Sequence, residues 1–361
     1  MAKNPKAPPK KKAARSPVTE TANARAGVVP PKRGPVTLDE ARALAQAKQQ
    51  PARTAARLAG VAPSVSPEKI GRARERVETE RDAEIARRET EYKAVMSIMK
   101  RRGARAAATA QAFAPLQICA EGDSWFDYPA FLSGGIVPRL ERRVGVPILN
   151  LAKAGDEVRY MLGVKERTEL IDRLRRGSPA GGPWDVLLFS GGGNDVVDNP
   201  MALWVKDWNP AIPPAAHLNQ ARFDNVLALV RAGYDDLIDI RDKFSPTTHL
   251  VFHDYDFAIP DGRNVCVFFG PWLKPTFDLK GFPTLAARQA VVDAMLKGFA
   301  AMLAQITNDP ARKATFINGQ GTLPRKTSSW HNELHPTEPG FDQFADIFHT
   351  RLKALFPNRV A

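Results

Sequence analysis

The sequence predicts an α/β fold, a three-layer α/β/α sandwich around a mainly parallel five-stranded sheet, preceded by a disordered and helical N-terminal extension. From Ala114 onward, short apolar runs alternate with amphipathic segments, as expected when helices cover both faces of a parallel sheet. Hydrophobic residues make up 43% of the 361 residues, enough to bury a sizeable core.

Charge is distributed unevenly along the chain. The formal net charge is +13, and residues 1–110 hold 25 Lys and Arg against 11 Asp and Glu, so the rest of the chain is near neutral. We predict a basic, mostly disordered tail over residues 1–65 and a long charged helix or linker over 66–110. A globular domain is expected over 111–361.

Two helix starts lie in the N-terminal part. Residues 1–36 are rich in Lys, Pro and Ala, which is typical of disorder. Thr37 and Glu40 form the pattern of a capping box, which predicts a short helix toward Gln50. Ser66-Pro67 predicts a second, highly charged helix.

This second helix should run to about Arg102 and has a narrow apolar stripe. The stripe fits a coiled-coil seam, one face laid on the domain, or a solvated helical spacer. Its members are Ile70, Val77, Ile85, Tyr92, Met96 and Met99.

The alternating segments of the domain predict five strands and five helices. The expected strands are Leu116–Cys119, Val146–Leu151, Val186–Ser190, His249–His253 and Ala314–Asn318. The expected helices lie near Ile136–Arg143, Tyr160–Arg176, Arg222–Lys243, Leu285–Ile306 and Gly340–Phe356.

Several classes of protein are not favoured by the sequence. Cys119 and Cys266 both lie in strand-like runs, so we expect buried free thiols, and no Cys or His cluster has metal-ligand spacing. We therefore expect no cofactor or metal. No long apolar window predicts a transmembrane helix, and the N-terminus lacks the apolar region of a Sec signal. We expect a cytoplasmic protein, or one exported without a Sec signal peptide.

Chemically useful residues follow the predicted strands. Ser124 lies in a Gly-Asp-Ser turn after the first strand, Gly155 follows the second, Asn194 follows a glycine run after the third, and His335 precedes the last helix. The carboxyl ends of parallel strands meet in one crevice, so these groups should converge. A serine, a histidine and N–H donors are what acyl transfer requires.

Taken singly, each of these residues also fits an ordinary role in a turn, a strand end or a loop. The glycine run lacks the Lys and Ser/Thr of a phosphate-binding loop. The stretch His253–Asp256 fits a metal site or, as we favour, pocket lining or loop structure, because no third ligand stands at recognisable spacing.

These motifs resemble the four blocks of the SGNH (GDSL-like) hydrolases, in the same order. Gly122-Asp123-Ser124 matches the nucleophile block, Gly155 the glycine of the second, Gly192–Asp195 the third, and His335 the base of the last. The resemblance covers roughly residues 116–356 and implies a flavodoxin-like fold with esterase or lipase activity.

The resemblance also implies roles for individual residues. Ser124 would be the nucleophile and His335 the general base. The N–H groups of Ser124 and Gly155, with the Asn194 side chain, would form the oxyanion hole. Asp123, Trp125 and Asp195 stand beside these residues in the sequence and are expected to contact the substrate.

Two positions depart from the family pattern. Trp125 stands where Leu is common, and Asn332 stands where the family has the aspartate three residues before the histidine. Asn332 would orient His335 in a weaker triad, or Glu333, Asp254 or Asp256 would supply the missing carboxylate. In a third reading, the site binds without turnover.

Two functions therefore compete. The first is a serine hydrolase that cleaves a carboxylic ester in an acyl lipid, an O-acetylated sugar or a thioester. The aromatic residues Trp125, Phe126, Tyr128 and Phe131 would line the acyl pocket or simply pack in the core. The alternative is a catalytically weak binding module whose basic tail binds nucleic acid or an anionic surface without specificity. The tail also fits a solubilising linker.

Overall fold

The central sheet has five parallel strands. The computed structural model describes residues 37–42, 67–107, 114–129, 134–264 and 270–360. The strands lie in the order β2-β1-β3-β4-β5. Their bounds are Ile118–Gly122 for β1, Ile148–Asn150 for β2, Val186–Ser190 for β3, His249–His253 for β4 and Ala314–Ile317 for β5. This confirms the predicted α/β class and the predicted five-stranded, mainly parallel sheet, in which all four strand pairings are parallel.

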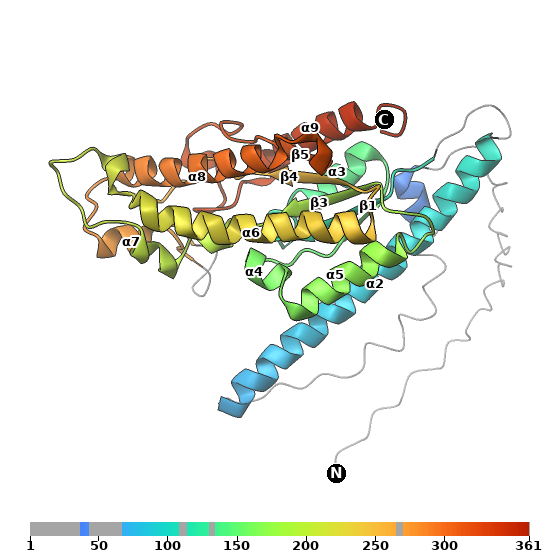
Figure 1. Cartoon of the computed structure of the whole chain (residues 1–361), viewed down its shortest axis with the longest axis horizontal. Coiled ribbons are helices and arrows are strands. Elements are labelled where there is room, and N and C mark those ends of the chain that lie inside the picture. Colours follow the sequence, from blue (N-terminus) through green and yellow to red (C-terminus); the bar gives the residue numbers. More distant parts are fainter. Residues whose placement is uncertain (1–36, 43–66, 108–113, 130–133, 265–269, 361) are drawn as a thin grey trace, which may run out of the picture. The chain divides into compact units, whose positions relative to one another are not determined.

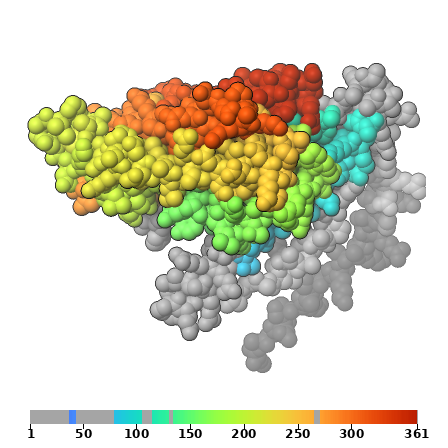
Figure 2. Space-filling view, in the orientation of Figure 1, coloured from blue at the N-terminus to red at the C-terminus, as the bar shows by residue number. Residues whose placement is uncertain are grey.

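Helices cover both faces of the sheet. They are α2 (Pro67–Ala107), α3 (Val137–Val144), α4 (Val158–Met161), α5 (Val164–Arg176), α6 (Gln220–Phe244), α7 (Lys274–Leu279), α8 (Leu285–Thr307) and α9 (Glu338–Leu355). Helices α3 and α9 pack together over one face, whereas α6 lies between α5 and α8 over the other (Figure 1). The side chains of α6 and α8 form much of the surface seen in Figure 2.

The predicted elements agree with the structure in most places. The bounds of β3 and β4 are those expected from the sequence. The single helix expected over 160–176 is wrong, because the chain breaks it into α4 and α5 at Gly163. A Cβ at Gly163 would lie 3.0 Å from the carbonyl oxygen of Tyr160, so a larger residue would crowd this tight connection. Helix α7 was not predicted.

Helix α2 lies against β2, an edge strand of the sheet. Tyr92, Val95, Met96 and Met99 are buried, and Arg88 Nη1 donates to the carbonyl oxygen of Asn150 at 3.2 Å. The sequence left three possibilities for the apolar stripe. Over residues 85–99, the structure shows the second of them, a helix face that packs on the domain. The side chains of Ile70 and Val77 lie outside the described residues.

The start of the first N-terminal helix is confirmed. Thr37 Oγ1 accepts the N–H of Glu40 at 3.2 Å, and Glu40 Oε2 accepts the N–H of Thr37 at 3.1 Å, the two bonds of a capping box. The predicted disorder of residues 1–36 and the helix beyond residue 42 lie outside the described residues. Cys119 is a buried free thiol in β1, and Cys266 lies outside the described part.

One described helix, α8, is long and apolar enough by length and composition to span a membrane. Half of its apolar window is buried inside the domain, where Phe299 and Leu303 are inaccessible to solvent. This is weak evidence for a span, because the core helix of a globular domain passes the same test.

Candidate active site

The loop after β1 holds Ser124 in a tight turn. The carbonyl oxygen of Asp123 accepts the N–H groups of Phe126 and Asp127. Gly122, just before this turn, packs so closely on β3 that a Cβ would lie 2.5 Å from the carbonyl oxygen of Ser190. Glycine at this position therefore lets β1 and β3 deliver the serine to the sheet edge.

Asp123 is a structural carboxylate that anchors this turn. Its Oδ1 accepts the Trp125 N–H at 3.0 Å and the Ser190 hydroxyl at 2.7 Å, and its Oδ2 accepts the Tyr255 hydroxyl at 2.5 Å. Complete burial raises the pKa of Asp123 to about 6, against the effect of these donors. Three donors from three segments thus fix the backbone on which Ser124 stands.

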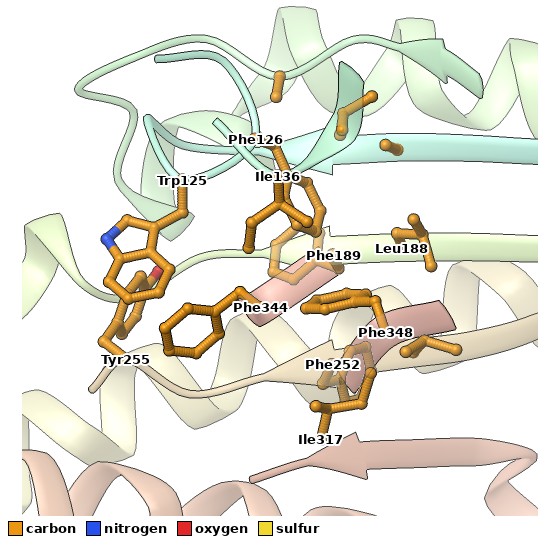
Figure 3. Packing of buried hydrophobic residues seen from close by; sticks show 14 of the residues in the cluster. Trp125, Phe126, Ile136, Leu188, Phe189, Phe252, Tyr255, Ile317, Phe344 and Phe348 are labelled. Atoms are coloured by element: carbon orange, nitrogen blue, oxygen red, sulfur yellow. The ribbon is translucent and has the colours of Figure 1, made fainter. Parts of the chain in front are cut away.

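Aromatic packing holds the same loop from the other side. The rings of Trp125 and Phe344 meet edge to face with centroids 4.9 Å apart, and Trp125 meets Tyr255 in the same way at 5.2 Å. Phe126 packs on Phe348 of α9 (Figure 3). Trp125 therefore belongs to the core beneath the serine as well as to the pocket wall, which explains a large residue at this position.

Ser124 and His335 form a hydrogen-bonded pair. The distance from Ser124 Oγ to His335 Nε2 is 2.7 Å, and both side chains are buried. On the far side of the ring, Nδ1 lies 3.0 Å from Asn332 Oδ1. Burial, with a further contribution from nearby His331, lowers the pKa of His335 to about 3, so the ring is neutral and can accept a proton.

None of the carboxylates suggested as replacements is hydrogen-bonded to His335. Glu333 accepts the backbone N–H groups of Gly262, Trp272, Leu273 and Lys274. Asp254 and Asp256 accept backbone N–H groups of the loop after β5, at residues 319, 321 and 323. These acids support the loops around the site, and Asn332 alone faces the imidazole Nδ1 among the described residues.

The expected oxyanion donors lie on three loops. Asn194 Nδ2 donates to the carbonyl oxygen of Asp156 at 2.9 Å, which leaves its second N–H for a ligand. The N–H groups of Ser124 and Gly155 have no hydrogen-bond partner within the described chain. Gly155 has a φ of +87°, a conformation that favours glycine, but it does not line the cavity beside Ser124.

The glycine run after β3 is tightly packed rather than flexible. A Cβ at Gly192 would lie 2.6 Å from the ring of Phe299, and one at Gly193 would lie 2.7 Å from the ring of Tyr255. Any side chain at these positions would displace a buried ring. The run therefore holds Asn194 in a defined place.

A small cavity of about 40 Å³ opens beside the serine. Ser124, Asn194 and His335 are among the polar residues that line it. Its walls are mainly apolar, formed by Val196, Val197, Ala258, Leu273, Met295 and Leu334. The Ser124 hydroxyl is therefore next to a small, mainly apolar space.

The four sequence blocks therefore meet at the carboxyl end of one parallel sheet of the order 2-1-3-4-5. Their serine and histidine, 211 residues apart in the sequence, are in hydrogen-bond contact.

The chain has a three-layer α/β/α fold with the flavodoxin-like strand order 2-1-3-4-5.

No family model matches the chain, and no curated protein matches its sequence. Among solved structures, a lipase from a goat rumen metagenome is 17% identical with a TM-score of 0.43, over 65% of this chain and 96% of that one. An extracellular lipase from Streptomyces rimosus is 17% identical with a TM-score of 0.40, over 65% and 99%. A phospholipase A1 from Streptomyces albidoflavus is 13% identical with a TM-score of 0.39, over 66% and 99%.

The candidate site differs in detail from what the sequence indicated. Asp195 accepts the N–H of Val158 at the start of α4 and does not line the cavity, so its expected contact with substrate stays a prediction. Asp123 and Trp125 do line the cavity. Sequence reasoning missed two residues next to Asn332. The hydroxyl of Tyr128 is hydrogen-bonded to the Asn332 amide, and the ring of His331 is hydrogen-bonded to that hydroxyl.

The stretch after β4 contributes to the pocket as well as to loop structure. Tyr255 and Asp256 line the cavity. His253 is completely buried between the rings of Trp125 and Phe126, and burial lowers its pKa to about 4. No group of side chains with metal-binding geometry occurs in the described ranges.

Proposed function

We propose that this protein is a serine hydrolase that cleaves a carboxylic ester with a short acyl chain. The observation that supports it most directly is the 2.7 Å contact of Ser124 Oγ with His335 Nε2 at the wall of an apolar cavity. A buried serine paired with a neutral imidazole is an activated nucleophile.

In the proposed reaction, Ser124 Oγ attacks the ester carbonyl carbon while its proton passes to His335 Nε2. The N–H groups of Ser124, Asn194 and Gly155 stabilise the negative charge that develops on the carbonyl oxygen. The intermediate then collapses, and His335 gives its proton to the departing alcohol. Water attacks the acyl-serine, His335 accepts the water proton, and that proton returns to Ser124 as the acid leaves.

The size of the cavity supports a short acyl group. Its volume of about 40 Å³ is small beside the roughly 300–1,000 Å³ of typical ligand pockets. An acetyl group fits such a space with minor side-chain movement, whereas a fatty acyl chain needs several walls to move. We therefore favour an acetyl or similarly short ester over a long-chain lipid.

The test uses the full-length chain. Hydrolysis of nitrophenyl acetate, butyrate and octanoate is measured, together with labelling by a fluorophosphonate. We expect the acetate to be the best substrate, and Ser124→Ala to lose both activity and labelling. Ser178→Ala is the matched control, because Ser178 is equally buried but contacts Tyr92 on α2. A folded wild-type chain that neither turns over any ester nor labels would contradict the proposal.

The second candidate, a weak or inactive binding module, is favoured by one observation. His335 faces an amide rather than a carboxylate, and an amide stabilises imidazolium less. In that case, full-length protein would be retained on DNA or anionic vesicles in a salt-sensitive way, and removal of residues 1–65 would abolish retention. The ester assay and this binding assay have independent outcomes.

A further inference from the structure

We propose that Tyr128 is a positioning residue that, with His331, holds the amide of Asn332 with its oxygen toward His335. The inference rests on the proposed function. It explains how a triad with asparagine in the place of aspartate keeps its base in the reactive tautomer.

The groups around the Asn332 amide determine its orientation through their hydrogen bonds. Its Oδ1 lies 2.9 Å from the backbone nitrogens of both Leu334 and His335, and 3.0 Å from His335 Nδ1. Two of these three groups are obligatory donors, so the atom they face must be the carbonyl oxygen. His335 Nδ1 must then bear the proton that Oδ1 accepts, which leaves Nε2 free to take the proton of Ser124.

The other end of the same amide is fixed by Tyr128. Asn332 is completely buried, and its Nδ2 lies 2.9 Å from Tyr128 Oη. Because Nδ2 can only donate, the tyrosine oxygen accepts. The tyrosine proton then goes to the one other partner within reach in the described structure, His331 Nδ1 at 3.0 Å. Every link from Ser124 to His331 thus has a defined donor.

Tautomer control is a particular need of an amide. A carboxylate presents only acceptors, so either of its oxygens selects the Nδ1–H form of histidine. A rotated amide presents its NH₂ group and selects the opposite form, in which Nε2 holds a proton and cannot act as a base. In the acyl-transfer template, replacing the aspartate by asparagine costs about 10⁴ in turnover for this reason.

Tyr128→Phe isolates the hydroxyl. The Tyr128 ring stacks on His335 with centroids 4.2 Å apart and planes 19° apart, and phenylalanine keeps that contact. Without the oxygen, the buried Nδ2 group has no acceptor, so the Asn332 side chain moves to find one and Oδ1 leaves His335. We expect kcat to fall roughly ten- to hundredfold with little change in KM.

The deciding experiment is a double-mutant cycle with Asn332→Asp. A carboxylate has no N–H to leave unpaired, so in that background Tyr128→Phe should cost only a few-fold in kcat. A readout independent of turnover is the ¹⁵N NMR signature of His335, which should change from Nδ1–H toward Nε2–H in Tyr128→Phe alone. Tyr92→Phe, which removes a buried hydroxyl bonded to Ser178, is the matched control.

Equal costs of Tyr128→Phe in both backgrounds, or an unchanged His335 tautomer, would overturn the inference. Should Tyr128→Phe fail to fold, His331→Ala removes the acceptor of the tyrosine proton from the exposed side. We expect a several-fold loss of kcat in His331→Ala. An unchanged kcat would contradict the proposed series of hydrogen bonds from Ser124 to His331. Wild-type activity that survives Ser124→Ala would instead refute the proposed function and leave the NMR result to stand alone.

Discussion

Replacing Asn332 by aspartate should move the pH dependence of the enzyme. In the wild type, burial and the nearby His331 lower the pKa of the proposed base, His335, to about 3. Its Nδ1 is 3.0 Å from the oxygen that would become charged in Asn332→Asp. The new carboxylate would accept hydrogen bonds from four groups: the backbone N–H of Leu334, the backbone N–H of His335, the imidazole N–H and the Tyr128 hydroxyl. These bonds would stabilise the buried negative charge.

The magnitude follows from the geometry. Unit charges about 4 Å apart interact by about 4 kcal/mol at an effective dielectric of about 20, which corresponds to about 3 pKa units. We therefore expect the His335 pKa to rise from about 3 toward about 6 in Asn332→Asp. Since the base must be unprotonated, the acid limb of kcat/KM should move upward by the same interval.

The assay is the pH profile of kcat/KM on nitrophenyl acetate from about pH 4 to about pH 9. At about pH 5, Asn332→Asp should fall roughly tenfold below its own plateau while the wild type stays on its plateau. The plateau itself should be higher in the variant, because a carboxylate stabilises the imidazolium. Circular dichroism at each pH controls for unfolding. Superimposable acid limbs would refute the reasoning that the uncharged partner at position 332 leaves the pKa of His335 low.

Three further predictions concern other parts of the domain. Asn194→Ala should lower kcat roughly 10²–10³-fold with the fold intact, as measured by ester turnover and thermal melting, since it removes one oxyanion donor. Met295→Ala, at a buried wall of the cavity, should raise the butyrate-to-acetate ratio of kcat/KM about tenfold or more, at a cost of about 2–5 kcal/mol in stability; an unchanged ratio would mean that the acyl group binds elsewhere. Burial raises the pKa of Glu121 from 4.5 to about 7, so its ionisation destabilises the fold progressively as pH rises through that interval. Denaturant titrations of Glu121→Gln should match the wild type below about pH 4.5 and give about 3 kcal/mol more stability above about pH 7.

The order of the motifs along the chain predicted which residues meet in the loops at the carboxyl ends of the strands. Ser124 and His335 are 211 residues apart, yet parallel strands deliver their following loops to one edge, so the pairing could be inferred before the structure. The same reasoning did not define the direction of the Asp195 side chain, because neighbours in sequence do not face the same way in a tight turn; its expected contact with substrate stays a prediction. Its carboxylate binds the start of α4 instead of the cavity.

The supporting contacts had no signature in the sequence. Glu333 stands beside the expected triad position, but its carboxylate points away to four backbone N–H groups near residues 262 and 272–274. Tyr128 reaches Asn332 across 204 positions of the chain. Such bonds depend on side-chain direction within loops, and neither periodicity nor turn propensity encodes that direction.

The position of α2 has a consequence for how the protein can be divided. The amino-acid composition predicts that the globular domain begins near residue 111. The preceding helix, α2, nevertheless buries Tyr92 and Met96, and its Arg88 donates a hydrogen bond to the edge strand β2. A fragment without α2 would expose the edge strand β2 and the apolar surface that α2 covers. Exposed strand edges and apolar patches of this kind promote aggregation. We therefore expect fragments that lack α2 to self-associate, and an expression fragment should begin before residue 67.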